Sequence, residues 1–284
     1  MSSTIKTMSR PKKTAPPTPR EALHALLQEL NFKGMARVLD SELDRAERNG
    51  ISGVELVHRL LSEQATFERE RSLLNRVAQA RLPWPWTIDT FPFERQGGVN
   101  KAQILGLADL EFVRRADNLV LIGGTGTGKT GIALGLLRQA CVNGWRGRFY
   151  NAQTLLDELY ASLADRTTTK LLTALSRMQP LCIDELGYLN LKAEQVNAFF
   201  RLMDQRYGKV STIITSNLDY PQWYELFNNK PLVDALLDRL QHHCITIRIE
   251  GPSLRSSAPA NAQAATASPR PPTATQSKAP PKTR

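Results

Sequence analysis

The sequence predicts an α/β protein with a five-stranded parallel sheet, preceded by a small all-α N-terminal domain and flanked by disordered tails. Short apolar runs alternate with helical segments between residues 87 and 255, whereas residues 18–82 have helical periodicity alone. Alternating strands and helical crossovers are typical of a parallel sheet, whose ligand site lies at the carboxyl ends of the strands. The predicted strands are 119–122, 148–150, 181–183, 212–215 and 245–249.

The two ends of the chain carry most of its net charge of +10. Residues 1–20 hold five basic side chains and residues 256–284 hold four, without an acidic residue in either segment. Both ends are also rich in proline, and such compositions bury too little apolar surface to fold. We therefore expect a disordered basic arm at residues 1–17 and a disordered tail at 256–284. Such segments attract any polyanion without reading its sequence.

The helical N-terminal domain is expected to span residues 18–82. Thr18 and Glu21 have the spacing of a capping box around a proline at the first helical position. Ser52 is placed to cap a third helix that can run to Arg81, because Pro83 cannot continue it. The buried stripe of this helix is predicted to contain Leu73, Leu74 and Val77.

Residues 83–95 form a predicted aromatic linker between this domain and an α/β domain at residues 96–255. The sequence Leu-Pro-Trp-Pro-Trp at residues 82–86, where the linker begins, suits neither a regular helix nor a central strand. No apolar run reaches the length of a membrane helix, and the N-terminus does not resemble a signal peptide. We expect a cytoplasmic protein without a membrane contact.

The strongest motif runs from an apolar strand into a helix. Residues 123–130 fit the pattern G-x-x-x-x-G-K-[S/T] of a P-loop. Its glycines let backbone N–H groups surround a polyphosphate, the helix N-terminus adds a positive dipole, and Lys129 reaches the terminal phosphates. The hydroxyl of Thr130 is a ligand for Mg²⁺. The predicted nucleotide-binding residues are Gly123, Gly124, Thr125, Gly126, Thr127, Gly128, Lys129, Thr130 and Gly131.

An acidic pair, Asp184 and Glu185, follows the predicted strand 181–183. A P-loop commonly works with one carboxylate near Mg²⁺ and a second that orients the attacking water. We assign Asp184 to Mg²⁺, through a water molecule, and Glu185 to activation of the hydrolytic water.

Two more residues have positions that suit the site. Asn217 follows strand 212–215, where it can sense the γ-phosphate, hold the water, or simply form a turn. Arg239 lies on an amphipathic helix. Its spacing permits an ion pair with Asp234 or Glu225, or a role as an arginine finger on a neighbour's nucleotide, and leaves these alternatives open.

Several motifs follow one another in a particular order. After the P-loop come Ile-Asp-Glu-Leu-Gly-Tyr-Leu at 183–189, Ile-Thr-Ser-Asn at 214–217, Asp-Arg-Leu at 238–240 and Gly-x-Ser-x-Arg at 251–255. In this order, and with an N-terminal domain of similar pattern, the chain resembles the IstB-type transposition helper ATPases, which are AAA+ proteins related to the DnaC helicase loaders. The resemblance covers about residues 20–255. It departs at Leu254, where a tyrosine is usual, and at Gly131, where a histidine is common.

The resemblance implies a role for each matching residue. Asn217 would be sensor 1, Arg239 an arginine finger acting in trans, and Arg255 the candidate for sensor 2. With ATP and Mg²⁺ as cofactors, residues 96–255 would be an AAA+ ATPase domain. The implied catalytic set is Glu185, Lys129, Asn217, Arg239 and Arg255.

The resemblance also implies a function. Such a protein would oligomerise on duplex DNA as a ring or a helical filament, deform the DNA, and recruit or stimulate a cognate transposase. Hydrolysis that needs a neighbour's arginine would then control assembly. The alternatives are a DnaC-like replicative helicase loader and a DNA architectural protein that uses ATP only as structural glue; the presence of Glu185 argues against the second.

Basic residues predict a surface for DNA phosphates. Residues 131–180 hold six basic and three acidic side chains, and arginines accumulate late in the N-terminal domain. No base-reading element is evident, so we expect binding that is largely independent of DNA sequence. For any single arginine, a solvated helix face remains the alternative. The candidate residues are Arg146, Arg148, Arg166, Lys170, Arg69, Arg71 and Arg76.

Overall fold

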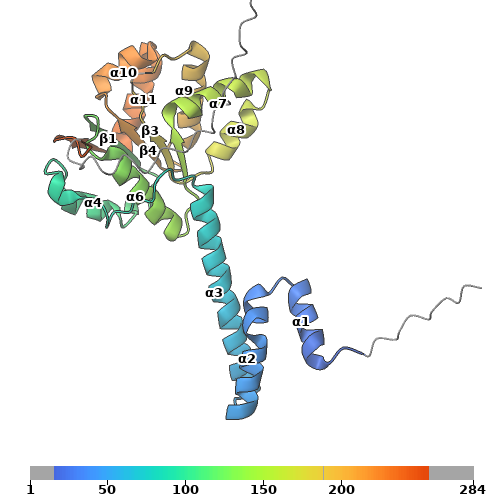
Figure 1. Cartoon of the computed structure of the whole chain (residues 1–284). Helices are drawn as coiled ribbons and strands as arrows, with labels where there is room; N and C mark the ends of the chain where they lie inside the picture. Colours follow the sequence, from blue (N-terminus) through green and yellow to red (C-terminus); the bar gives the residue numbers. More distant parts are fainter. Residues whose placement is uncertain (1–15, 188, 256–284) are drawn as a thin grey trace, which may run out of the picture.

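The computed structural model describes residues 16–187 and 189–255, which form an α/β body and a group of helices projecting from it (Figure 1). Two sequence-based expectations fall outside these residues. They are the predicted disorder of the N-terminal arm, apart from residues 16 and 17, and that of the tail at 256–284. Tyr188 of the 183–189 motif also lies outside the described residues.

A five-stranded parallel sheet forms the centre of the body, as predicted, with the order β2-β3-β4-β1-β5. In the middle of the sheet, Leu119 of β1 pairs with Ile213 of β4 and Ile245 of β5. All five predicted strands are confirmed, each one or two residues longer than expected. They are β1 Asn118–Gly123, β2 Arg148–Asn151, β3 Leu181–Asp184, β4 Thr212–Ser216 and β5 Cys244–Ile249.

Helices cover both faces of the sheet. Helices α4 to α6 and the segment before α4 pack on one face, around Leu119, Leu121 and Ile213. Helices α7 to α11 pack on the other face, around Val120 and Ile183. The helices are α4 Lys101–Leu107, α5 Glu111–Arg114, α6 Lys129–Val142, α7 Ala152–Ala164, α8 Thr168–Leu175, α9 Ala193–Arg206, α10 Tyr220–Phe227 and α11 Lys230–His242. Within residues 16–187 and 189–255, no helix is long and apolar enough to cross a membrane.

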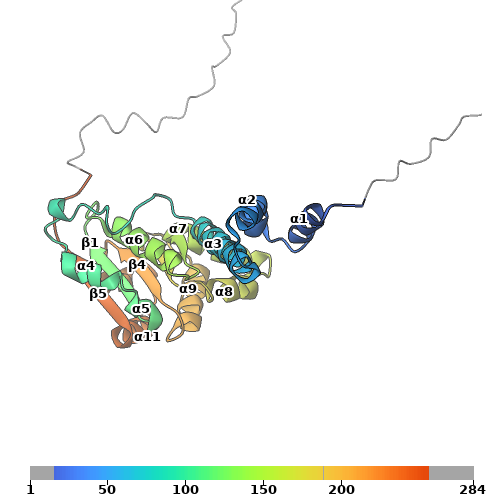
Figure 2. The same ribbon diagram turned by 90° about the horizontal axis from the view of Figure 1, so that it is seen from below.

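The predicted N-terminal helices are α1 Pro19–Glu29, α2 Lys33–Asn49 and α3 Gly53–Gln79. The capping box at the start of α1 is present, and the side chain of Ser52 accepts a hydrogen bond at the start of α3. The three helices form an open row in which α2 separates α1 from α3, as both views show (Figures 1 and 2). The centre of this row consists of the buried Leu27, Leu39 and Leu60.

The last turns of α3 differ from the sequence-based expectation. The helix ends at Gln79, before Arg81, which has a left-handed φ of 53°. Leu74 was expected to be buried, yet 70% of it is exposed, while Leu73 and Val77 are half-buried. The reason is geometric, because α1 and α2 lie beside the half of α3 that is remote from the sheet (Figure 1). Neither covers Leu74.

The linker packs against the α/β body, as its aromatic composition suggested. Ile88 and Phe91 are buried in the core beneath α6. The ring of Phe91 lies 6.4 Å from that of Trp86 and 4.8 Å from that of Phe93, measured between centroids. The short 3₁₀ helix η1 Phe93–Arg95 then leads toward α4. The linker is therefore part of the wall around the ends of the strands.

Candidate nucleotide-binding site

The loop between β1 and α6 has the geometry of a phosphate-binding loop. Gly126 and Gly128 have φ values of 82° and 95°, a region that glycine adopts without steric cost. The Nζ of Lys129 donates hydrogen bonds of 2.8 and 2.7 Å to the carbonyl oxygens of Gly123 and Gly124. Burial lowers the pKa of Lys129. Its present partners are neutral, so a phosphate oxygen would be a stronger acceptor for the ammonium group.

Asp184 lies at the end of β3 and faces the P-loop. Its Oδ1 accepts hydrogen bonds of 2.8 Å from Thr130 Oγ1 and 2.6 Å from Thr215 Oγ1. Burial raises the pKa of Asp184, and the two hydroxyl donors oppose that shift. A hydroxyl and a carboxylate side by side are oxygen ligands of the kind that Mg²⁺ accepts. Thr130 and Asp184 therefore fit the Mg²⁺ that such a site requires.

Glu185 projects from the next position into the same cleft. Its φ of 61° is uncommon for a residue with a side chain, and such conformations persist only where the surroundings hold them. Here the backbone N–H of Glu185 donates to Thr215 Oγ1 at 2.9 Å. Its Oε2 accepts a 3.0 Å hydrogen bond from Asn151 Nδ2, at the end of β2. Three neighbouring strands thus position one carboxylate.

Asn217 follows β4 at the same edge of the sheet. A Cβ atom on Gly187 would come within 1.8 Å of its Oδ1, so a larger residue at that point would displace the Asn217 amide. Ser216 Oγ donates to the carbonyl of Leu186 and accepts from the N–H of Leu218, which ties the residues on either side of Asn217.

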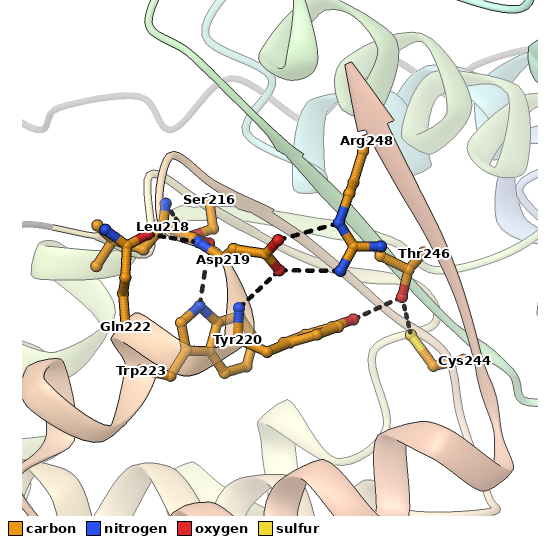
Figure 3. A network of polar contacts seen from close by, with 9 residues as sticks. All are labelled: Ser216, Leu218, Asp219, Tyr220, Gln222, Trp223, Cys244, Thr246 and Arg248. Carbon is orange, nitrogen blue, oxygen red and sulfur yellow. Dashed lines mark hydrogen bonds and ion pairs between the residues drawn. The ribbon is translucent and has the colours of Figure 1, made fainter. Parts of the chain in front are cut away.

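Beyond Asn217 the turn is anchored to the edge strand β5. Asp219 caps α10 and accepts two hydrogen bonds of 3.0 Å from the guanidinium of Arg248 on β5 (Figure 3). This pair lowers the pKa of Asp219. Figure 3 also shows Tyr220 directed at Thr246 of the same strand, at 2.6 Å. The turn that carries Asn217 is therefore held at both ends.

A cavity of about 590 Å³ lies over the P-loop and is large enough for a small-molecule ligand. One wall is aromatic, with Trp84, Trp86 and Phe91 from the linker. Glu185 and Asn217 also line the cavity. A flat apolar wall beside a phosphate loop suits a purine base. The linker's aromatic residues predicted packing onto this domain, but spacing alone did not place them in the cavity.

The segment after β5 crosses the P-loop. The N–H of Leu254 donates to the carbonyl of Gly126 at 2.9 Å, and the Leu254 side chain lies against Gly128. Arg255 lines the cavity, and its charge contributes to the lowered pKa of Lys129. The structure thus brings Arg255 to the same cleft as the P-loop.

Arg239 is the predicted site residue that lies elsewhere. On α11 it forms a 2.8 Å ion pair with Asp204 of α9 and stacks over Tyr207, 5.9 Å from the ring centroid. The two local partners considered from spacing are wrong: Asp234 accepts from the hydroxyl of Tyr224 instead, and the ion pairs among the described residues include none between Arg239 and Glu225. Arg239 does not line the cavity of its own chain.

The predicted DNA contacts separate into different environments. A polar groove between α3 and the end of α6 is lined by Arg71, Arg76 and Arg146, together with Glu68. Arg71 lies 3.9 Å from Glu68, a distance at the limit of an ion pair. The exposed Arg69, Arg166 and Lys170 do not line this groove; Arg166 and Lys170 belong to the turn before α8 and to α8 itself.

Two of these arginines already have structural partners. Arg76 Nε donates to the carbonyl of Cys141 near the end of α6 at 2.8 Å. Arg148 Nη1 donates to the carbonyl of Gln79 at the end of α3 at 2.9 Å and stacks over Tyr150. An arginine at a helix C-terminus satisfies free carbonyl groups and the helix dipole. Arg76 and Arg148 thus join α3 to the α/β body.

Solved structures with a similar fold define the class of protein. The DnaC helicase loader superposes with a TM-score of 0.51 at 23% identity, covering 60% of this chain and 99% of that one. AMPPCP-bound DnaA from Aquifex aeolicus superposes with a TM-score of 0.50 at 20% identity, covering 62% and 53%. This likeness shows that the chain has the α/β P-loop fold of the AAA+ class.

The sequence comparisons identify the family. The chain belongs to the IstB-like ATP binding proteins, whose family profile matches residues 25–262. It is 35% identical to the insertion sequence IS21 ATP-binding protein of Pseudomonas aeruginosa, over 82% of this chain and 88% of that protein. It is 31% identical to the insertion sequence IS5376 ATP-binding protein of Geobacillus stearothermophilus, over 83% and 94%.

Proposed function

We propose that this protein is a Mg²⁺-dependent ATPase that assembles on duplex DNA, deforms it and recruits or stimulates the transposase of an insertion element. Hydrolysis of ATP controls the assembly, which is a ring or a helical filament. The observation that carries the proposal is the convergence of Lys129, Glu185, Asn217 and Arg255 on one cavity, where Asp184 is hydrogen-bonded to the lining residue Thr130.

The residues of the cavity suit hydrolysis of the γ-phosphate. The P-loop N–H groups and Lys129 bind the phosphates. Thr130 and Asp184 would hold Mg²⁺, which would supply positive charge to neutralise the phosphates. Glu185 accepts the proton of a water molecule whose oxygen bonds to the γ-phosphorus as the bond to the bridging oxygen breaks. Asn217 and Arg255 contact the γ-phosphate. The aromatic wall of Trp84 and Trp86 receives the base.

A neighbouring subunit completes this site in the proposal. Arg239 lies on α11, outside the cavity of its own chain, and its ion pair with Asp204 keeps the guanidinium in place. An arginine finger supplied in trans accelerates hydrolysis by about 10³- to 10⁵-fold in related phosphoryl transfers. Hydrolysis then requires a neighbour, and only assembled protein turns over rapidly.

The groove beside α3 is the proposed contact for DNA phosphates. Arg71 and Arg146 are its best candidates, because Arg76 and Arg148 are engaged with backbone carbonyls. The names of the relatives place them in insertion sequences, which supports a transposase rather than a replicative helicase as the partner. A pull-down that scores transposase against helicase distinguishes the two.

Electron microscopy of the protein with duplex DNA tests the proposal, with and without a non-hydrolysable ATP analogue. We expect rings or filaments only with nucleotide, and we expect Lys129→Ala to abolish them. Lys209→Ala, an exposed lysine in the turn before β4, is the matched control and should assemble normally. Assembly on DNA without any nucleotide would contradict the coupling of ATP to assembly.

A further inference from the structure

The segment that carries Arg255 is hydrogen-bonded through its backbone to the P-loop and to Arg95. The N–H of Leu254 donates to the carbonyl of Gly126, and Arg95 Nη2 donates to the carbonyl of Leu254 at 3.4 Å. A Cβ atom on Gly126 would come within 2.0 Å of Ser253 Oγ, so the two segments are in direct contact. Any shift of the P-loop must therefore displace the segment before Arg255, or break these contacts.

Gln96 also connects the P-loop to the segment before Arg255. Its side chain is fully buried, with 0% exposure. Its Nε2 donates to the carbonyl of Thr127 in the P-loop at 3.1 Å and to the carbonyl of Pro252 at 2.9 Å. A buried amide is costly unless it is hydrogen-bonded, and its NH₂ group has two donors. Here each donor serves one of the two segments.

The surroundings leave Gln96 little freedom to move. A Cβ atom on Gly251 would lie 2.0 Å from Gln96 Oε1, and one on Gly98 would lie 1.2 Å from the carbonyl oxygen of Glu250. Gly251 therefore packs against the Gln96 amide, and Gly98 packs against the backbone of the preceding residue, Glu250. A bridge this confined transmits displacement instead of absorbing it.

We propose that Gln96 is a positioning residue that fixes Arg255 relative to the P-loop, at a place where the arginine reaches the γ-phosphate of bound ATP. The inference rests on the proposed ATPase function. Gln96 itself is too deeply buried to touch ATP, and it acts through the carbonyls of Thr127 and Pro252. A misplacement of about 1 Å at a reacting centre can lower a rate by roughly 100-fold.

The test compares hydrolysis and nucleotide affinity in full-length variants bound to duplex DNA. Gln96→Met keeps the volume of the side chain and removes both donors. We expect its turnover to fall roughly 10- to 100-fold, with a much smaller change in the Kd of the ATP analogue. Gly251→Ala should act alike, since it displaces Gln96 without altering it. The matched control, Gln103→Met at an exposed position on α4, should hydrolyse normally.

Variants of Arg255 separate positioning from mere structural support. If Gln96 acts through Arg255, Gln96→Met should cost little further turnover in an Arg255→Ala background. The amide of Leu254 should also exchange its hydrogen faster in Gln96→Met, while β1 stays protected. An equal loss of turnover in both backgrounds, or full activity of both Gln96→Met and Gly251→Ala, would overturn the inference. Absence of turnover in the wild-type protein on DNA would instead refute the proposed ATPase function.

Discussion

The nucleotide cleft and a surface of basic residues for DNA were both predicted from the sequence, but the structure brings together the residues of the first and separates those of the second. In the cleft, residues that follow four of the strands converge with residues of the linker, because parallel strands end at one edge of the sheet. Of the seven basic residues predicted to contact DNA, three line the groove, and Arg76 among them bonds to a backbone carbonyl. A motif that follows a strand predicts where its side chains lie, whereas the number of charges in a segment does not.

The difference has a physical cause. The position of a carboxylate directly after a buried strand is set by that strand. An arginine has a long side chain with five donors and can donate to the free carbonyl groups of a distant helix end. Arg76 and Arg148 do this across the junction of α3 and the α/β body. Their guanidinium groups are therefore hydrogen-bonded within the protein, although the sequence shows only a cluster of basic residues.

The largest expected effect concerns the residue that lies outside its own cleft. Arg239→Ala should lower DNA-stimulated hydrolysis by about 10³-fold or more while ATP binding persists. Mixing this variant with Glu185→Gln should restore activity, because Glu185→Gln still assembles and supplies Arg239 to a cleft that has an intact Glu185. Arg201→Ala on the exposed side of α9 is the control. Failure of the mixture to recover activity would show that Arg239 does not act in trans.

Glu185→Gln should reduce turnover by roughly 10²- to 10⁴-fold, the range for loss of a general base. The amide cannot take the proton of the attacking water, yet it keeps the shape of the side chain. Equilibrium binding of ATP should be almost unchanged, and assemblies on DNA should persist longer than those of the wild type. Glu194→Gln, at the exposed start of α9, provides the control. Equal turnover of the wild type and Glu185→Gln would favour an architectural role for ATP.

Paired arginine variants examine the groove. Arg146→Met should weaken DNA binding and reduce the slope of log K against log salt concentration by about 1. Arg76→Met should mainly destabilise the junction of α3 with α6, because it removes the hydrogen bond to Cys141. Salt titration of DNA affinity and thermal unfolding measure the two effects. If Arg76→Met changed the salt slope and left the Tm unaltered, its assignment to the fold would be wrong.

Asp184→Asn should have the smallest effect of these variants. Unlike Arg76→Met, it should stabilise the folded protein. Burial raises the pKa of Asp184, so the folded protein disfavours the charged carboxylate that prevails at neutral pH. Stability without nucleotide should therefore fall as pH rises from the ordinary aspartate pKa through the raised value. The neutral amide removes this cost and should raise Tm by about 2–4 °C in the absence of Mg²⁺. A lower Tm would contradict this account.

Much of the fold was accessible from the sequence because its signals are local. Strand boundaries were correct to within two residues, since apolar runs end where the backbone leaves the core. The capping box at Thr18 was likewise a matter of spacing alone. The exposure of Leu74 was not predictable in this way, because it depends on where α1 and α2 lie along α3.

The residues of the candidate site also divide into those with a local sequence signal and those that only tertiary structure reveals. Lys129, Asp184 and Asn217 were found from motifs at strand ends. Asn151, which holds Glu185, also follows a strand, and its place at the C-terminal edge of β2 was a usable signal. Gln96 has no such signal, since its two acceptors lie 31 and 156 residues away in the chain. Contacts of that range follow from tertiary structure and from no pattern around residue 96.

The central claim is that the cleft of one subunit hydrolyses ATP only when a neighbour on DNA completes it. The most direct measurement is the hydrolysis rate per subunit as a function of protein concentration, with and without duplex DNA. We predict a rate per subunit that rises with concentration, reaches a plateau, and does so at lower concentration when DNA is present. A rate per subunit that stays constant over the whole range and ignores DNA would contradict it.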